Sequence, residues 1–208
     1  MGTNKRGLYL RKFAFLISVG VLFVSAELAH AQQFDVAAGG GTLMSTKNTT
    51  ASQTYLPPPE KGGLYPNVSI DRIRKNHYGY NAEVSFRYHY ALYNHYQQFR
   101  PVIYDFNALY TTHLAKKTTG ILMAGAGGQT TLFYSPYGNC FYTAGCSTHV
   151  NSTHLLFHFG GEVQYRVWRN VFLRPEAHYY YIINNTDEFH SGNILRVGAS
   201  IGYTFHTD

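Results

Sequence analysis

Charged residues at alternate positions are the side chains in this sequence that could do chemistry together. Glu83 and Arg87 are four residues apart, and Arg174 and Glu176 are two apart. An even spacing places side chains on the same face of a β-strand. We therefore expect these groups to face one interior, where buried acids and bases must pair. The expected interior set is Glu83, Arg87, Asp105, Glu162, Arg166, Arg174, Glu176 and Arg196.

The segments that carry these charges alternate between apolar and polar residues. Over residues 78–90 the even positions are Tyr, Ala, Val and Phe, and the odd positions are Gly, Asn, Glu, Ser, Arg and His. Such alternation predicts a strand with one apolar and one polar face. The pattern recurs in residues 154–167, 171–183 and 195–205. Each of these segments is long enough to cross a bilayer as a tilted strand.

Residues 34–44, 102–110 and 120–134 show the pattern less cleanly and bring the count to seven. Bacterial membrane barrels have an even number of strands, so we place an eighth strand at residues 64–73. The sequence thus predicts an all-β fold, an eight-stranded antiparallel up-and-down transmembrane β-barrel. Short periplasmic turns are expected at residues 75–76, 114–118 and 168–170, and external loops at 45–63, 91–98, 135–152 and 184–192.

The composition also favours a membrane barrel. The chain has 19 Tyr, 14 Phe and 20 Gly, and only 13% of its residues are charged. Beyond residue 31 no run approaches 18 apolar residues, so no transmembrane helix is expected. A closed barrel is the other structure that satisfies every backbone polar group in lipid. Tyrosines near the strand ends fit the aromatic girdles of such barrels.

Residues 1–31 have the layout of a cleaved secretory signal peptide. Basic residues precede an apolar run of about 14 residues, and Ala29-His30-Ala31 forms a small-x-small cleavage site. We expect Sec-type export and a mature barrel domain of residues 32–208. Without the signal peptide, the chain has 13 Lys and Arg residues and 10 Asp and Glu residues. This near balance removes the main support for a nucleic-acid partner.

The last predicted strand resembles the assembly signal of outer-membrane barrels. It alternates hydrophobic residues, carries Gly198 and ends on an aromatic, with Gly198, Ile201, Tyr203 and Phe205 as the matching positions. Three residues follow Phe205, where that signal usually ends. Residues 159–165 and 173–176 are similar to the penultimate hairpin of small OmpA/OmpX-like barrels. The resemblance implies an outer-membrane location, contact with lipids and lipopolysaccharide, and assembly by the barrel-insertion machinery.

Cys140 and Cys146 are the two cysteines, with five residues between them. Two nearby cysteines in an oxidising compartment most often pair, so we expect a disulfide in the third external loop. A metal site there would need more ligands than the nearby His149 and His154. Histidines elsewhere are spread over separate strands and fit hydrogen-bonded interior residues better than a metal site. No cofactor and no metal are therefore expected.

Three functions remain open. The first is a structural, adhesion or surface-interaction role with a lumen closed by charged and polar side chains, since eight strands enclose a space that side chains can fill. Its loops carry aromatic residues that could meet an external ligand: Tyr93, Tyr96, Phe141 and Tyr142. The second is a narrow passive pore for small solutes. The third is a soluble exported barrel that carries a ligand.

We do not expect an enzyme. Some small outer-membrane barrels modify lipid A, which requires a Ser or His with an acid at the lipid-facing rim. The candidates here are Glu188, His190 and Ser191. Their spacing does not reproduce the His-x-Ser followed by a more distant Glu that the lipid A deacylase family uses.

Overall fold

The computed structural model describes residues 33–45, 60–74, 77–93, 97–141, 145–189 and 191–206. For residues 135–141, 145–148, 187 and 206 it describes the backbone alone. The expected signal peptide, residues 1–31, lies outside the described residues. No helix in this part of the chain has the length and hydropathy needed to span a bilayer.

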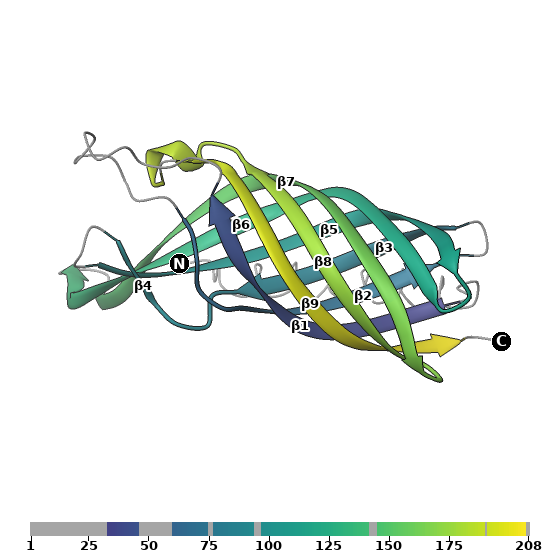
Figure 1. The fold of residues 1–208 in the computed structure, drawn as a ribbon. Coiled ribbons are helices and arrows are strands. Elements are labelled where there is room, and N and C mark those ends of the chain that lie inside the picture. The colour runs from purple at the N-terminus through teal and green to yellow at the C-terminus, as the bar shows by residue number, and fades with distance from the viewer. Residues whose placement is uncertain are drawn as a thin grey trace, which may run out of the picture.

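The described chain is almost entirely strand, and the strands form one closed antiparallel barrel (Figure 1). The first half contains β1 (Gln33–Ser45), β2 (Tyr65–Ile73), β3 (Tyr78–Phe86), β4 (Ala91–Tyr93) and β5 (Gln97–Ala115). The second half contains β6 (Thr118–Phe141), β7 (Gly145–Trp168), β8 (Val171–Ile182), the 3-10 helix η1 (Asn185–Asp187) and β9 (Asn193–His206).

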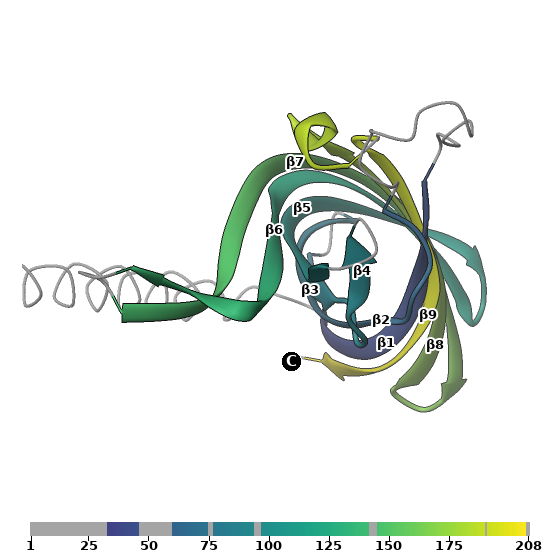
Figure 2. The same ribbon diagram turned by 90° about the vertical axis from the view of Figure 1, so that its left-hand side faces the viewer.

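Closure comes from two pairings. The sheet order runs from β3 through β2, β1, β9, β8, β7 and β6 to β5, and β3 then pairs with β5. The first and last strands are neighbours along their whole length, from Gln33 opposite His206 to Ser45 opposite Ile194. Figure 2 shows the ring nearly end-on. The predicted eight-stranded barrel, including the strand inferred at residues 64–73, is confirmed.

The two faces of each strand differ as the alternation predicts. On β3, Tyr78, Tyr80 and Val84 are exposed, whereas Asn81 and Glu83 are buried. Each of the eight barrel strands carries at least one large apolar side chain that is exposed on the outer face, such as Met44 on β1 and Leu122 on β6. The molecule is therefore apolar outside and polar within, the reverse of a water-soluble core.

Two clusters of buried apolar residues lie on either side of the central polar interior. One buried cluster comprises Leu43, Tyr65, Ile103, Leu156, Tyr180, Ile182 and Ile194. The other comprises Ile73, Leu109, Ile121 and Met123, near the opposite ends of their strands. The polar residues between these clusters are shielded from water along the barrel axis.

The strand lengths differ from prediction in two places. The β3 ladder ends at Phe86 opposite Val102, because the next residue of β5 is Pro101, which has no backbone N–H to donate. The predicted loop 91–98 instead contains β4, paired with the start of β5. The predicted loop 135–152 is mostly strand, since β6 and β7 continue beyond the barrel as a two-stranded ribbon (Figures 1 and 2).

Candidate functional site in the barrel lumen

Six of the eight expected interior charges lie together in the lumen. They are Glu83 on β3, Asp105 on β5, Glu162 on β7, Arg174 and Glu176 on β8, and Arg196 on β9. All six are buried. The strands bring residues that are far apart in the sequence onto one inner surface. On its own strand, each of these residues has inward parity, which means that it occupies one of the alternate positions whose side chains point into the barrel.

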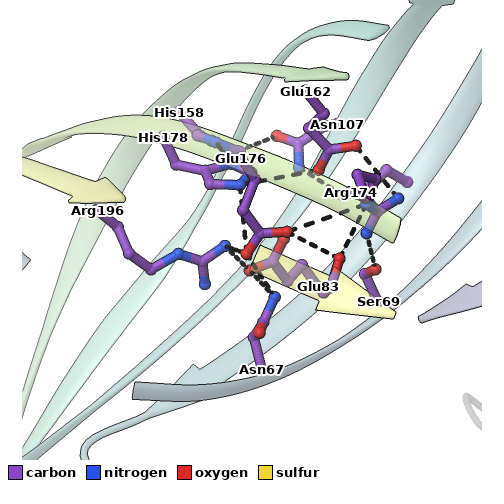
Figure 3. Close-up of polar contacts among 12 residues, drawn as sticks. Asn67, Ser69, Glu83, Asn107, His158, Glu162, Arg174, Glu176, His178 and Arg196 are labelled. Atoms are coloured by element: carbon purple, nitrogen blue, oxygen red, sulfur yellow. Dashed lines mark hydrogen bonds and ion pairs between the residues drawn. The ribbon is translucent and has the colours of Figure 1, made fainter. Parts of the chain in front are cut away.

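Arg174 is the first of two arginines that organise this cluster (Figure 3). Its Nη1 contacts Asp71 Oδ2 and lies 3.2 Å from Glu162 Oε2. Its Nε donates to Ser200 Oγ at 3.2 Å, and its Nη2 donates to Ser69 Oγ at 2.5 Å. The guanidinium therefore connects β8 with β2 and β7, across the interior and along the sheet.

Arg196 organises the other side of the cluster. Its Nη2 contacts Glu83 Oε1 and lies 3.2 Å from Glu176 Oε1. The same Glu176 oxygen accepts a 2.9 Å hydrogen bond from Asn67 Nδ2, and its Oε2 accepts one from Ser200 Oγ at 3.1 Å. Glu176 thus links both arginine groups.

The remaining two expected interior charges lie elsewhere. Arg87 follows the end of β3 and donates from Nη1 to the backbone oxygen of Gly62 at 3.1 Å, at the mouth of the barrel. Arg166 has inward parity, but it is exposed near the turn between β7 and β8, beyond the filled lumen. Parity predicts the face of a strand and does not predict where along the axis the filled interior ends.

A chain of amides and imidazoles runs beside the ion pairs. Asn81 Nδ2 donates to Asp71 Oδ1 at 2.5 Å, and Asn107 Nδ2 donates to Asn81 Oδ1 at 2.8 Å. His158 Nδ1 lies 2.8 Å from Asn107 Oδ1, and His158 Nε2 lies 2.9 Å from His178 Nδ1. The inward parity of both histidines is visible in the sequence, whereas their contact depends on the stagger between β7 and β8.

The mouth of the barrel is closed by aromatic rings. Tyr93, Phe99, Phe133 and Phe189 lie in mutual ring contact, with the Phe99 and Phe189 centroids 5.2 Å apart. The Tyr93 hydroxyl donates to the backbone oxygen of Glu188 at 2.7 Å. Phe189 is completely buried, so the segment that follows η1 (185–187) is anchored in the barrel opening.

Glu60 is buried at this mouth, ahead of β2. Its Oε2 accepts a 2.9 Å hydrogen bond from Gln129 Nε2. Burial raises the pKa of Glu60 to about 7, and Gln129 and Arg87 only partly oppose this shift. Sequence reasoning missed this residue, because Glu60 follows three prolines in a predicted loop.

The structure also places the residues considered for catalysis. Glu188 Oε1 lies 3.3 Å from His154 Nε2, and Ser152 Oγ lies 3.0 Å from the same nitrogen. A Ser-His-acid triad needs the serine and the acid on opposite ring nitrogens. Ser191 is buried and donates to the backbone oxygen of Asn193, while His190 lies outside the described residues. These contacts do not form a triad.

The structure describes the two cysteines by their backbone alone. The backbones of Cys140 and Cys146 are opposite each other in the β6–β7 ladder. Their side chains lie outside the described residues, so the disulfide stays a prediction.

Comparison with known proteins rests on structure. No protein-family model and no curated protein sequence matches the chain. Solved structures do match. Neisserial surface protein A superposes with a TM-score of 0.56 at 14% identity, covering 83% of this chain and 96% of that one. The attachment invasion locus protein Ail of Yersinia pestis gives a TM-score of 0.55 at 11% identity, covering 84% and 99%.

The N-terminal β-barrel domain of Pseudomonas aeruginosa OprF gives a TM-score of 0.52 at 10% identity, covering 85% of this chain and 99% of that domain. This is the fold of the small outer-membrane barrels. The OmpA/OmpX-like resemblance is thereby confirmed as a resemblance of fold. At these identities the comparison carries no information on ligands or activity.

Proposed function

We propose that this chain is an integral outer-membrane protein whose barrel is closed to solutes and whose role is structural or surface-interacting. The observation that carries the proposal is the inverted distribution of polarity. Exposed apolar side chains surround the barrel, and the interior holds buried, mutually bonded charges. In water such an outer surface would aggregate, whereas in lipid it is solvated.

The closed lumen rests on the contacts across the interior. Arg174, Arg196 and Glu176 bond to residues of β2 and β3, on the far side of the barrel. Eight strands leave space that side chains can fill, and here they fill it. The apolar clusters at both ends add two further barriers along the axis. These features favour a closed barrel over a passive pore.

We also propose how the protein is exported and assembled. Residues 1–31 direct export, and the last strand, with Gly198, Ile201, Tyr203 and Phe205, is read by the barrel-assembly machinery. Lipids and lipopolysaccharide then surround the apolar belt. The β6–β7 ribbon projects beyond the barrel at the end opposite the C-terminus (Figure 1) and is the surface offered to an external ligand.

Two measurements test the proposal separately. Membrane fractionation should recover the protein in the outer membrane, extractable only with detergent and running as a heat-modifiable band. Recovery in the periplasm without detergent would favour a soluble exported barrel. In planar bilayers the pure protein should show no stable openings, and reproducible single-channel steps would establish the pore instead.

A further inference from the structure

The central cluster contains more acid than base. The two arginines contact four carboxylates, Asp71, Glu83, Glu162 and Glu176. With all four ionised, these six side chains have a net charge of −2 in a place where none of them reaches water. Asp105 is a further buried carboxylate beside them, with its Oδ1 3.2 Å from His158 Nδ1. Buried charge is costly unless it is neutralised. Either bound protons or a bound cation must neutralise this surplus of acid.

Three of the buried side chains have coordinating atoms without a hydrogen-bond partner in the described part of the chain. These atoms are Glu83 Oε2, both carboxylate oxygens of Glu162, and His178 Nε2. Glu162 Oε2 is close to Arg174 Nη1, at 3.2 Å, but makes no hydrogen bond with it. Glu83, Glu162 and His178 each offer one ligand atom, and the three atoms lie within 4.8 Å of one another.

The amide and imidazole chain determines which nitrogen of His178 carries a lone pair. Asn107 donates from Nδ2, so its Oδ1 accepts, and His158 Nδ1 must be the donor to it. In the tautomer with the His158 proton on Nδ1, His158 Nε2 accepts from His178 Nδ1. His178 Nε2 is then unprotonated and carries a lone pair. This nitrogen lies 3.8 Å from Glu162 Oε1 and 3.8 Å from Glu176 Oε1. A lone pair facing two carboxylates calls for a cation between them.

We propose that Glu83, Glu162 and His178 bind one divalent transition-metal cation of the Zn²⁺ class. Imidazole nitrogen together with carboxylate oxygen is a donor set that such ions accept, at about 2.0–2.2 Å. The ion offsets the surplus of two negative charges among the two arginines and the four carboxylates that they contact. His158 holds the second ring nitrogen of His178, as groups behind metal-binding histidines commonly do. The sequence predicts hydrogen-bonded interior histidines and no metal. The approach of His178 to Glu83 and Glu162 depends on the stagger between strands, which the sequence pattern does not show.

The test uses the mature barrel, refolded from urea into detergent micelles with excess Zn²⁺, because buried ligands load most readily during folding. After gel filtration in metal-free buffer, elemental analysis should find about one Zn²⁺ per chain. Glu162→Gln and His178→Gln should bind at least about tenfold more weakly. His154→Gln is the matched control, since His154 is also inward-facing and contacts a carboxylate, and it should retain the metal.

Co²⁺ provides a second readout that needs no variant. Wild-type barrel folded with Co²⁺ should show visible d–d absorption from a site with nitrogen and oxygen ligands, and Zn²⁺ should displace it. Heat-modifiable migration shows which variants have folded, and Glu162→Gln, which changes only one atom, decides the matter if His178→Gln does not fold. A folded wild-type barrel without metal, or with equal metal in Glu162→Gln, would overturn the proposal and leave the acids to be neutralised by protons.

Discussion

Asn67 Nδ2 on β2 lies 2.9 Å from Glu176 Oε1 on β8. These strands are separated in the sheet by β1 and β9, so the hydrogen bond spans the lumen rather than following the ladder. Figure 3 shows Asn67 pointing toward the group formed by Glu176 and Arg196. The interior side chains therefore connect opposite walls of the barrel.

Replacing Arg174 with Met should lower the free energy of unfolding by about 3–5 kcal/mol, because Asp71 and Glu162 would stay buried after losing their counter-charge. Denaturant titration in micelles measures the change. Arg166→Met is the matched control: Arg166 is exposed on the neighbouring strand β7, and its loss should change stability by less than about 0.5 kcal/mol. Equal effects of the two substitutions would contradict the pairing described here.

Glu60 should make stability depend on pH. Its pKa is about 7 in the folded barrel and near 4.5 when unfolded, so the folded state binds the extra proton between these values. Stability should then fall as pH rises from about 4.5 to 7, by about 3 kcal/mol, and stay level above that. Glu60→Gln should remove this part of the dependence. A wild-type minus variant difference that is the same at pH 5 and pH 8 would refute the assignment.

Gly127 should tolerate no side chain. A Cβ there would overlap the backbone oxygen of Tyr104 on the adjacent strand β5. At Gly161 the nearest atom to an added Cβ is Leu122 Cδ2, at 3.8 Å. We expect Gly127→Ala to cost more than about 2 kcal/mol and Gly161→Ala less than about 0.5 kcal/mol. Unfolding midpoints of the two variants provide the comparison, and a neutral Gly127→Ala would show that β5 and β6 can separate.

Phe189 should hold the segment after η1 in the mouth. Truncating it to Ala removes a fully buried ring from contact with Tyr93, Phe99 and Phe133. Hydrogen exchange of residues 184–189 should become at least about tenfold faster while the barrel strands keep their protection. Leu92→Ala, an exposed residue of β4, is the control and should leave that exchange unchanged. Unaltered exchange in Phe189→Ala would mean that other contacts anchor the segment.

Most of the barrel was predictable from the sequence. Apolar and polar residues alternate along each segment, and side chains along a strand point alternately to its two faces. The alternation places Glu83, Glu162 and Arg196 on the inner face of their strands, and all three side chains are buried. Parity together with the even-number rule also located β2, whose own pattern is weak.

Axial position was less predictable. Arg87 has the right parity but falls beyond the point where Pro101 ends the β3 ladder, and Arg166 lies past the filled lumen. The meeting of His158 with His178, and of Asn67 with Glu176, depends on strand stagger and barrel diameter. These are properties of the closed sheet that no single segment encodes.

The pairing of β1 with β9 determines when the barrel can close. β9, the last strand of this barrel along the chain, pairs with β1, the first, from Gln33 opposite His206 to Ser45 opposite Ile194. The ring therefore cannot close before β9 is present, and until then the sheet has two edges with unpaired backbone groups. We therefore expect the chain to be most prone to aggregation and proteolysis in the interval before β9 closes the ring.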